Sequence, residues 1–554
     1  MEHVARRASS LEELQTEVQP ELLRGVPLDV CLSGNGQHFA RPDPGMFKVD
    51  VNLYRLSRQT KRFKAFLSHD WNTSRWLKLL SLLVIYNSRA AFVSSLLVTI
   101  CVGVLQAAHL IPKVWWTTSL VFAVFPFMFC FWQRIRSFLR IPVVVFFDKL
   151  CIPQHDEELK RNGIFGLAGF LDHADELTIL WSHRYFSRLW CTYEISTFLR
   201  DSEKPKPILV MPVKLAVVLV IFSAAMHVVM LGFSILEELR NSYGWELNSV
   251  SALPEGRMRD MFNKNALYLP FLGPVMPLLY YIGIGMMEDL AALPDQLSKF
   301  RVQDAGCFCC ANGHRHPDTG KELPCDRLLI FKMLKRWYGK VGDRKEQWQH
   351  LERFNQLVQE ELASKVLRKM GSDMLPWNYS FYMLIPGVLP DISALIPEIV
   401  AGNPELSSTS QQVIWALRLL IKWSMHGILC LIWIRTSMRI WLLAVRYMPH
   451  WCSNYRVRTA FLLTMPAGFG LTLVLFSHDI LMVISPDDSI LPLIPVAFWL
   501  LLLCGFWSQS SHVLTEAILT ASQGLRSHCI EAPQEPEQVE DAAKDDDSDS
   551  RWSV

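Results

Sequence analysis

The sequence predicts an α/β domain with a parallel sheet, interrupted by a transmembrane hairpin and joined to an all-α membrane bundle of about eight helices. Two observations carry this prediction. Short apolar runs such as Phe63–Leu67 alternate with helix-length segments, which favours a parallel sheet covered by helices. Uncharged apolar stretches of bilayer length separate the two halves of this pattern and recur after it.

The composition favours a membrane protein and argues against nucleic-acid binding. Of 554 residues, 51% are hydrophobic, with 19 Trp and 31 Phe, which exceeds the need of an ordinary soluble core. The formal net charge is +2, and no basic block stands out. The N-terminus is polar and lacks an apolar signal region, so we expect both termini on the cytosolic side of a multi-pass protein.

The elements of the predicted sheet domain follow one another in a regular order. Strands are expected at Phe63–Leu67, Ile141–Asp148, Leu177–Ser182 and Pro205–Met211. Helices are expected at Thr73–Tyr86, at Asp156–Asp172 with a weak point at Gly163, and at Phe186–Arg200. For the sheet to close, Phe63–Leu67 and Val143–Phe147 must lie side by side although the hairpin separates them.

Six apolar stretches meet the length requirement between flanking charges: Ala90–Pro112, Val114–Gln133, Leu215–Leu236, Asn265–Met287, Thr459–His478 and Ser489–Ser511. Two more, Met374–Pro397 and Val413–Val445, are interrupted by Pro and Gly or by charged residues. Met374–Pro397 is therefore expected to be kinked or re-entrant. Either of the two could instead be a helix lying on the membrane surface, so six to eight spans remain open.

These patterns divide the chain into seven parts. They are a polar arm (1–60), a sheet domain in two pieces (61–89 and 134–212), a hairpin insert (90–133), two spans (214–287), a cytosolic segment with a Cys/His cluster and helices (288–373), about four further spans (374–511) and an acidic tail expected to be disordered (512–554). In the cytosolic segment, helices are predicted at Asp326–Trp337 and Asp343–Met370, with Gly371 as the stop.

Two short apolar runs of the sheet domain end in polar residues: Ala65–His69, which Asp70 follows, and Val145–Asp148. Arg188–Glu194 contains a Trp-Cys-x-x-Glu element at the start of a later predicted helix. These segments resemble the first strand, the second strand and the later helix signature of a plant-type Toll/interleukin-1 receptor (TIR) domain. The resemblance covers about 110 residues, between about 61 and 211 without the insert.

The chain departs from this family in three ways. TIR domains have no membrane hairpin after the first helix. The loop after Asp148 reads Lys-Leu-Cys-Ile-Pro-Gln instead of an acidic loop with Gly. A fifth strand and final helix cannot be placed before Lys214, which puts the closure of the domain in doubt.

The resemblance implies a flavodoxin-like sheet, signalling by self-association and, as in some members, cleavage of the nicotinamide–ribose bond of NAD. It implies Glu194 as the catalytic carboxylate, because an anion can stabilise the positive charge that builds on the ribose. Candidate nucleotide-binding residues, most of them at predicted strand ends, are Ser68, His69, Asp148, Ser182 and Trp190. Two alternatives remain open, because Glu194 could be a structural carboxylate and many TIR domains only assemble.

A cluster of thiols and imidazoles between positions 307 and 325 predicts a zinc site. The candidate ligands are Cys307, Cys310, one of His314 and His316, and Cys325, which match the four N and S ligands that tetrahedral zinc takes. The alternative is a juxtamembrane cysteine cluster that is free or palmitoylated.

A second function class stays open because charged residues inside lipid are costly and suggest a pathway. Asp391, Arg435, Arg439 and His227 fall within predicted spans. They raise the alternative of a transporter or channel whose TIR-like domain is structural or regulatory. No repeat relates two halves of the chain, so signalling ranks first.

Overall fold

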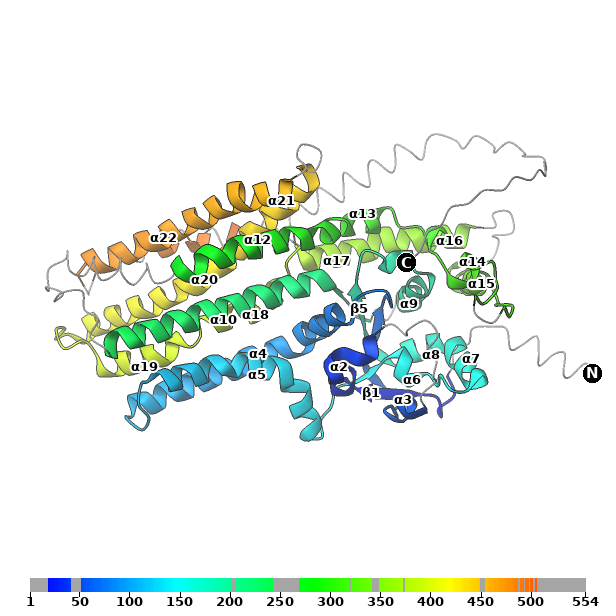
Figure 1. The fold of residues 1–554 in the computed structure, drawn as a ribbon, viewed down its shortest axis with the longest axis horizontal. Coiled ribbons are helices and arrows are strands. Elements are labelled where there is room, and N and C mark those ends of the chain that lie inside the picture. The colour runs from blue at the N-terminus through cyan, green and yellow to red at the C-terminus, as the bar shows by residue number, and fades with distance from the viewer. Residues whose placement is uncertain are drawn as a thin grey trace, which may run out of the picture.

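The computed structural model describes residues 18–40, 51–200, 206–242, 269–317, 320–340, 348–371, 374–448, 454–486, 489–492, 494–497, 499–501 and 504–505. Long helices run alongside one another and make up most of the molecule, and a small sheet with short helices lies at one end of them (Figure 1). The predicted acidic tail, 512–554, lies outside the described residues, as do residues 1–17 and 41–50 of the predicted arm.

The sheet has six strands in the order β2-β1-β4-β3-β5-β6. Their bounds are β1 Arg24–Pro27, β2 Arg58–Gln59, β3 Phe63–His69, β4 Val144–Phe146, β5 Ala174–Trp181 and β6 Ile208–Pro212. The pairs β3–β4, β3–β5 and β5–β6 are parallel, whereas β1 pairs antiparallel with both β2 and β4. The sheet is therefore mixed and mostly parallel, which confirms the coarse fold class.

The two strands that the hairpin separates in sequence are neighbours in the sheet, as predicted. Ala65 lies opposite Val145, and Phe66 lies opposite Phe146. The rings of Phe66 and Phe146 stack with centroids 4.6 Å apart, and both side chains are buried. Such continuous apolar burial is typical of strands covered on both faces.

The polar arm supplies β1 and β2, which the sequence did not predict. These strands are short and lack a clear apolar alternation, so pattern alone misses them. Val26 pairs with Val145, and the backbone of Gly25 passes so close to β4 that a Cβ there would lie 2.6 Å from Val144 Cγ1. The antiparallel edge they form corrects the expectation of a purely parallel sheet.

The helices of the sheet domain differ in detail from the prediction. The expected helix Asp156–Asp172 is broken at Gly166, not at Gly163, into α7 (Glu157–Phe165) and α8 (Leu167–Asp172). Asp156 caps α7 by accepting a hydrogen bond from the Leu159 amide at 2.9 Å. A short helix α6 (Asp148–Cys151) follows β4, and α9 (Leu189–Leu199) carries the Trp-Cys-x-x-Glu signature.

The first predicted helix and the first predicted span form one helix, α4 (Arg75–Ala107), of 33 residues. At 1.5 Å per residue it is about 50 Å long, which exceeds a bilayer core of about 30 Å. Its first turns therefore lie against the sheet. The chain returns through α5 (Trp115–Phe138) to β4, and β6 runs without a linker into α10 (Val213–Ser242).

Four helices within the described residues are long and apolar enough to cross a membrane: α4, α5, α10 and α20 (Thr409–Tyr447). A bent pair raises this number to at most five, so the expectation of about eight is too high for this part of the chain. The predicted span at 265–287 corresponds to α12 (Leu269–Ala291). The predicted span at 459–478 corresponds to the π-helical turn η6 (Thr459–Thr464) followed by α22 (Met465–Ile484). Neither α12 nor α22 is among the four helices. The predicted span at 489–511 is described only in part, as residues 489–492, 494–497, 499–501 and 504–505.

The bent pair lies where a kink or re-entrant segment was predicted. The segment Trp377–Gly387, which contains α18 (Trp377–Leu384) and the 3₁₀ turn η5 (Ile385–Gly387), meets α19 (Asp391–Ala401) at an angle of 65°. Proline in this break removes backbone donors and favours the bend.

In the described part of the chain, seven shorter elements lie between α12 and α18, and one of them, α15, packs against α9. They are α13 (Leu293–Ser298), the 3₁₀ turn η3 (Val302–Asp304), α14 (Phe308–Ala311), α15 (Asp326–Tyr338), α16 (Gln349–Leu357), the π-helical turn η4 (Val358–Leu362) and α17 (Ala363–Met370). Gly371 ends α17 with φ 75°, as its predicted role as a stop requires. In the arm, α2 (Leu28–Gly36), the 3₁₀ turn η1 (Gln37–Phe39) and α3 (Val51–Arg55) complete the domain.

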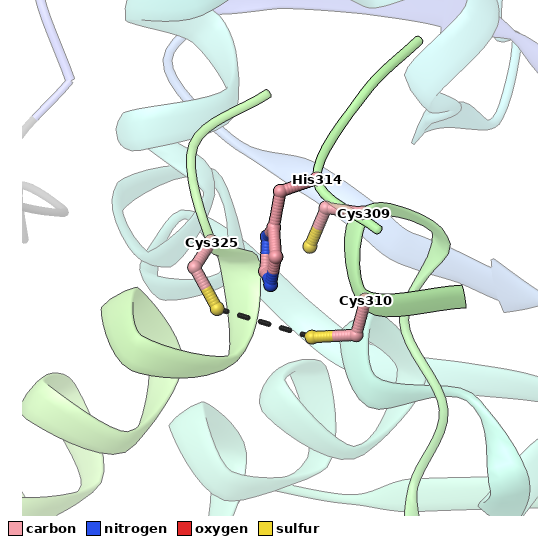
Figure 2. A group of neighbouring side chains, drawn as sticks. All are labelled: Cys309, Cys310, His314 and Cys325. Carbon is pink, nitrogen blue, oxygen red and sulfur yellow. Dashed lines mark hydrogen bonds between the residues drawn. The ribbon is translucent and has the colours of Figure 1, made fainter. Parts of the chain in front are cut away.

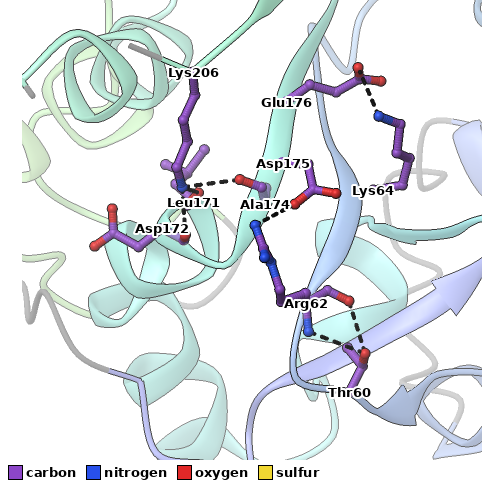
Figure 3. Close-up of polar contacts among 9 residues, drawn as sticks. All are labelled: Thr60, Arg62, Lys64, Leu171, Asp172, Ala174, Asp175, Glu176 and Lys206. Carbon is purple, nitrogen blue, oxygen red and sulfur yellow. Dashed lines mark hydrogen bonds and ion pairs between the residues drawn. The ribbon is translucent and has the colours of Figure 1, made fainter. Parts of the chain in front are cut away.

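Charged side chains fix the amino ends of the central strands (Figure 3). Arg62 pairs with Asp175 at 2.7 Å and Lys64 with Glu176 at 3.5 Å, which ties β3 to β5. Lys206 Nζ donates to the carbonyl oxygens of Asp172 and Ala174, at 2.5 and 3.0 Å. The opposite, carboxyl ends of the same strands carry the polar groups described next.

Candidate functional site

Ser68, near the carboxyl end of β3, lies in a chain of three hydrogen-bonded groups. Tyr185 donates its phenolic proton to Ser68 Oγ at 2.5 Å, and Ser68 Oγ donates to Glu194 Oε2. Ser68 and Tyr185 are buried, and Glu194 projects from α9 toward β3. The structure thus brings together two of the predicted site residues, Ser68 and Glu194.

Glu194 does not have the electrostatics of an exposed carboxylate. Burial raises its pKa to about 8, and the Ser68 hydrogen bond only partly offsets this. Burial likewise raises the pKa of the Tyr185 phenol well above its usual range. At neutral pH Glu194 is therefore mostly protonated, so it is suited to donate a proton, unlike the anion that the sequence predicts.

A second group of polar residues lies beside this chain. The ring of His69 is 4.6 Å from that of Trp71, and Trp71 Nε1 donates to Asp148 Oδ2 at 3.2 Å. Lys78, which is fully buried, lies over the Trp71 ring at 5.3 Å. Trp71 therefore contacts His69 through its ring and Asp148 through its Nε1.

Burial governs the titration of this group as well. It lowers the pKa of His69 well below its usual value, with the Lys78 charge adding to the effect. It raises the pKa of Asp148, which the Lys149 amide, Trp71 and Lys78 partly offset. His69 Nε2 is buried and has no hydrogen-bond partner among the described residues.

The two remaining predicted residues lie apart from the chain of hydrogen bonds. Ser182, just after β5, is buried, and its Oγ has no hydrogen-bond partner within the described part of the chain. Trp190 faces the segment 288–373, where its Nε1 donates to Asp326 Oδ2 at 3.2 Å. Its role in nucleotide binding stays a prediction.

Three residues of this region were missed by the sequence interpretation: Tyr185, Trp71 and Lys78. Tyr185 and Trp71 follow strand ends by a few positions, which is a weak signal. Lys78 had a stronger sequence signal. It lies in a predicted helix on the same face as Leu82 and next to Leu79, and both leucines are core residues, so a lysine at this position is unusual. Burial raises the pKa of the neighbouring Cys191 thiol, which favours the unreactive thiol form.

A separate cluster is formed by Cys309, Cys310, His314 and Cys325 (Figure 2). Their ligand atoms all lie within 4.8 Å of one another, so these four residues could hold a metal ion. Cys310 Sγ and Cys325 Sγ are 3.9 Å apart, which is close to the sulfur–sulfur edge of about 3.8 Å expected for tetrahedral zinc with Zn–S bonds of about 2.3 Å.

The cluster differs from the predicted ligand set at two positions. Cys309 takes the place of Cys307, whose Sγ lies 3.4 Å from Cys309 Sγ. His314 belongs to the group and His316 does not. The two consecutive residues Cys309 and Cys310 of α14 therefore both contribute a thiol to the group.

The backbone holds the imidazole of His314 in place. Gly313 and His314 both adopt positive φ, 57° and 59°, which reverses the chain after α14. The His314 amide then donates to the Cys309 carbonyl at 2.7 Å, and the Leu323 amide donates to the His314 carbonyl at 2.8 Å. The resulting small hairpin returns the chain to Cys325.

Comparison of the chain with protein-family models, with curated proteins and with solved structures finds no match. The TIR resemblance therefore rests on the sequence motifs quoted above and stays a prediction.

Proposed function

We propose that this chain is a multi-pass membrane protein whose cytosolic TIR-like domain acts in signalling by self-association. The four parallel strands run in the spatial order β4-β3-β5-β6, which in chain order is 2-1-3-4. The first four strands of a flavodoxin-like sheet have this order. This agreement supports the resemblance that the sequence motifs suggested.

One observation carries the signalling proposal: strands of the sheet are directly continuous with apolar helices. After β3 and five further residues the chain enters α4, and β6 ends at Pro212 immediately before α10 begins at Val213. A shift of α4 or α10 in a bilayer would therefore move the central strand or the edge strand β6. This construction suits the transfer of a signal between membrane and domain.

Self-association is tested on the full chain in lipid nanodiscs of a size that admits several copies. Mass photometry should show dimers or larger assemblies. Particles that remain monomeric as the ratio of protein to nanodisc rises would overturn the assembly proposal.

We also propose NAD cleavage, which the TIR resemblance implies, for the form of the site in which Glu194 has lost its proton, because the anion is what stabilises positive charge on the ribose. The supporting observation is the Tyr185–Ser68–Glu194 chain at the carboxyl ends of the strands, where open α/β sheets place their ligands. NAD and water would yield nicotinamide and ADP-ribose. Glu194→Gln should abolish nicotinamide release, and Glu158→Gln, on the exposed side of α7, should not. The absence of release by the parent chain would remove the enzymatic proposal without affecting the assembly proposal.

The transporter alternative has weaker support. Arg435 is fully buried, donates to the Leu375 carbonyl at 3.0 Å and lies over the Trp377 ring at 3.4 Å. These contacts tie α20 to the start of α18, which gives this costly charge a structural role.

We also propose that the metal held by Cys309, Cys310, His314 and Cys325 is zinc. Three thiolates and one imidazole make a soft N/S set of four, which is typical of structural zinc. Elemental analysis of the purified full chain should find about one zinc per chain. Cys325→Ser should lose it, and Cys101→Ser, at an exposed thiol of α4, should keep it.

A further inference from the structure

The metal-binding segment is joined to the beginning of α9 by a short backbone ladder. The Leu189 amide donates to the Gly306 carbonyl at 3.0 Å, and the Gly306 amide donates to the Ser187 carbonyl at 2.8 Å. Arg188 and Gly306 thus form a parallel bridge immediately before Cys307. The residues that enter α9 are held by the segment that carries the cluster.

A second connection runs through side chains. Cys309 Sγ accepts a hydrogen bond from the Asp326 amide at 3.3 Å, and Asp326 Oδ2 accepts one from Trp190 Nε1 at 3.2 Å. Two hydrogen bonds therefore connect the sulfur of Cys309 to Asp326 and Asp326 to the first turn of α9. Hydrogen bonds of this kind orient a metal ligand, so a change at the ligand also affects the residues bonded to it.

The far end of α15 holds the far end of α9. Tyr338 donates its hydroxyl proton to the Ser196 carbonyl at 2.6 Å, and the rings of Tyr193 and Trp337 stack at 5.5 Å. Because α15 begins directly after Cys325, its direction is set where that ligand is fixed. Glu194 lies between these two attachments.

The segment around the cluster has little core of its own. Among the described residues 305–317 and 320–325, only Ala305, Cys307 and Cys309 are buried. A segment with so few buried apolar groups needs a cross-link such as a metal to hold one conformation.

We propose that the metal bound by Cys309, Cys310, His314 and Cys325 is a structural tie that positions α9, and thereby holds Glu194 against Ser68 and Tyr185. All four ligands come from the protein, so no coordination position is left open for substrate. This inference rests on the proposed metal site and is independent of NAD cleavage and of self-association.

The test is hydrogen exchange on the full chain in nanodiscs, with zinc content measured on the same samples. After removal of zinc by a chelator, amide exchange in residues 189–196 should become at least about tenfold faster. Exchange in α2, which is remote from the cluster in sequence and lies on the other side of the sheet domain (Figure 1), should change by less than about twofold. Loss of zinc with unchanged exchange in α9 would overturn the tie.

Variants separate the metal from its connection to α9. Cys310→Ser should lose zinc and accelerate exchange in α9, whereas Cys307→Ser should keep zinc.

Asp326→Ala keeps all four ligands and should retain zinc, yet accelerate exchange around Trp190. Asp326→Asn retains an acceptor oxygen and should resemble the parent. Equal exchange in the two Asp326 variants contradicts the side-chain connection. If Cys310→Ser does not fold, chelation of the parent chain decides. A parent chain without zinc overturns both the metal site and the tie, whatever the NAD assay shows.

Discussion

Ser68 Oγ donates a hydrogen bond to Glu194 Oε2 although the two residues are 126 positions apart and the apolar hairpin lies between them. The contact joins β3, before the hairpin, to α9, after it. The segments on either side of the hairpin therefore fold into one domain, in which β3 and β4 are also neighbours. The same contact region raises the pKa of Glu194, so its protonation affects how stability depends on pH.

Glu194 should contribute a component of stability that falls as pH rises between about 4.5 and 8. Its pKa is about 8 in the folded protein against an ordinary value of 4.5, so within this window the folded state holds a proton that the unfolded state has released. The full contribution is present below 4.5 and lost as pH passes 8. Its slope is at most about 1.4 kcal/mol per pH unit.

Glu194→Gln should remove this component, because an amide stays neutral. The free energy of unfolding, measured by denaturant titration in detergent from pH 5 to 9, should fall less steeply with pH in the variant than in the parent. Parallel curves for the two proteins would show that Glu194 titrates normally and contradict its burial.

Lys78 should matter to stability far more than a surface lysine. It is fully buried beside Trp71, and it partly offsets the burial of the Asp148 carboxylate. Lys78→Met should destabilise the protein by about 1–3 kcal/mol, since it removes the hydrogen bond to the Trp71 carbonyl and one of the positive charges that offset the burial of Asp148. Lys64→Met is the matched control: its ion pair with Glu176 is half exposed and should contribute at most about 1 kcal/mol. Equal losses in the two variants would refute the buried network.

The sequence predicted the central strands well because their apolar runs are long and end in polar residues. Ser68 and Glu194 could be proposed as partners only through a family motif, since no local pattern reports a contact between β3 and α9. Cys309 was missed because ligand choice depends on how α14 turns, and β1 because its pairing with β4 is decided by tertiary contacts. Buried Lys78 was the one missed residue with a clear local signal.

The close approach of α4 to α19 should depend on Gly103. A Cβ at this position would lie 2.7 Å from Ile396 Cδ1 and 3.1 Å from the Ser393 backbone, so the helices would have to separate. Gly103→Ala should therefore destabilise the bundle by about 1–3 kcal/mol. Gly470→Ala, in α22, meets nothing within 4 Å and should be neutral or slightly stabilising. Thermal unfolding in detergent distinguishes these outcomes, and a neutral Gly103→Ala would contradict the packing.

The apolar hairpin carries a buried polar link, which a double-mutant cycle can measure. Asn87 donates to the Phe129 carbonyl at 2.7 Å and accepts a hydrogen bond from Gln133 Nε2 at 2.8 Å, and both side chains are buried. Either single change to Leu leaves a buried polar group with fewer partners and should cost about 1–3 kcal/mol. The double change Asn87→Leu with Gln133→Leu removes both groups and should cost less than the sum of the single changes, because no amide is then left unpaired between the two helices. Strictly additive losses would mean that Asn87 and Gln133 act independently, and the polar link between α4 and α5 would then have no energetic role.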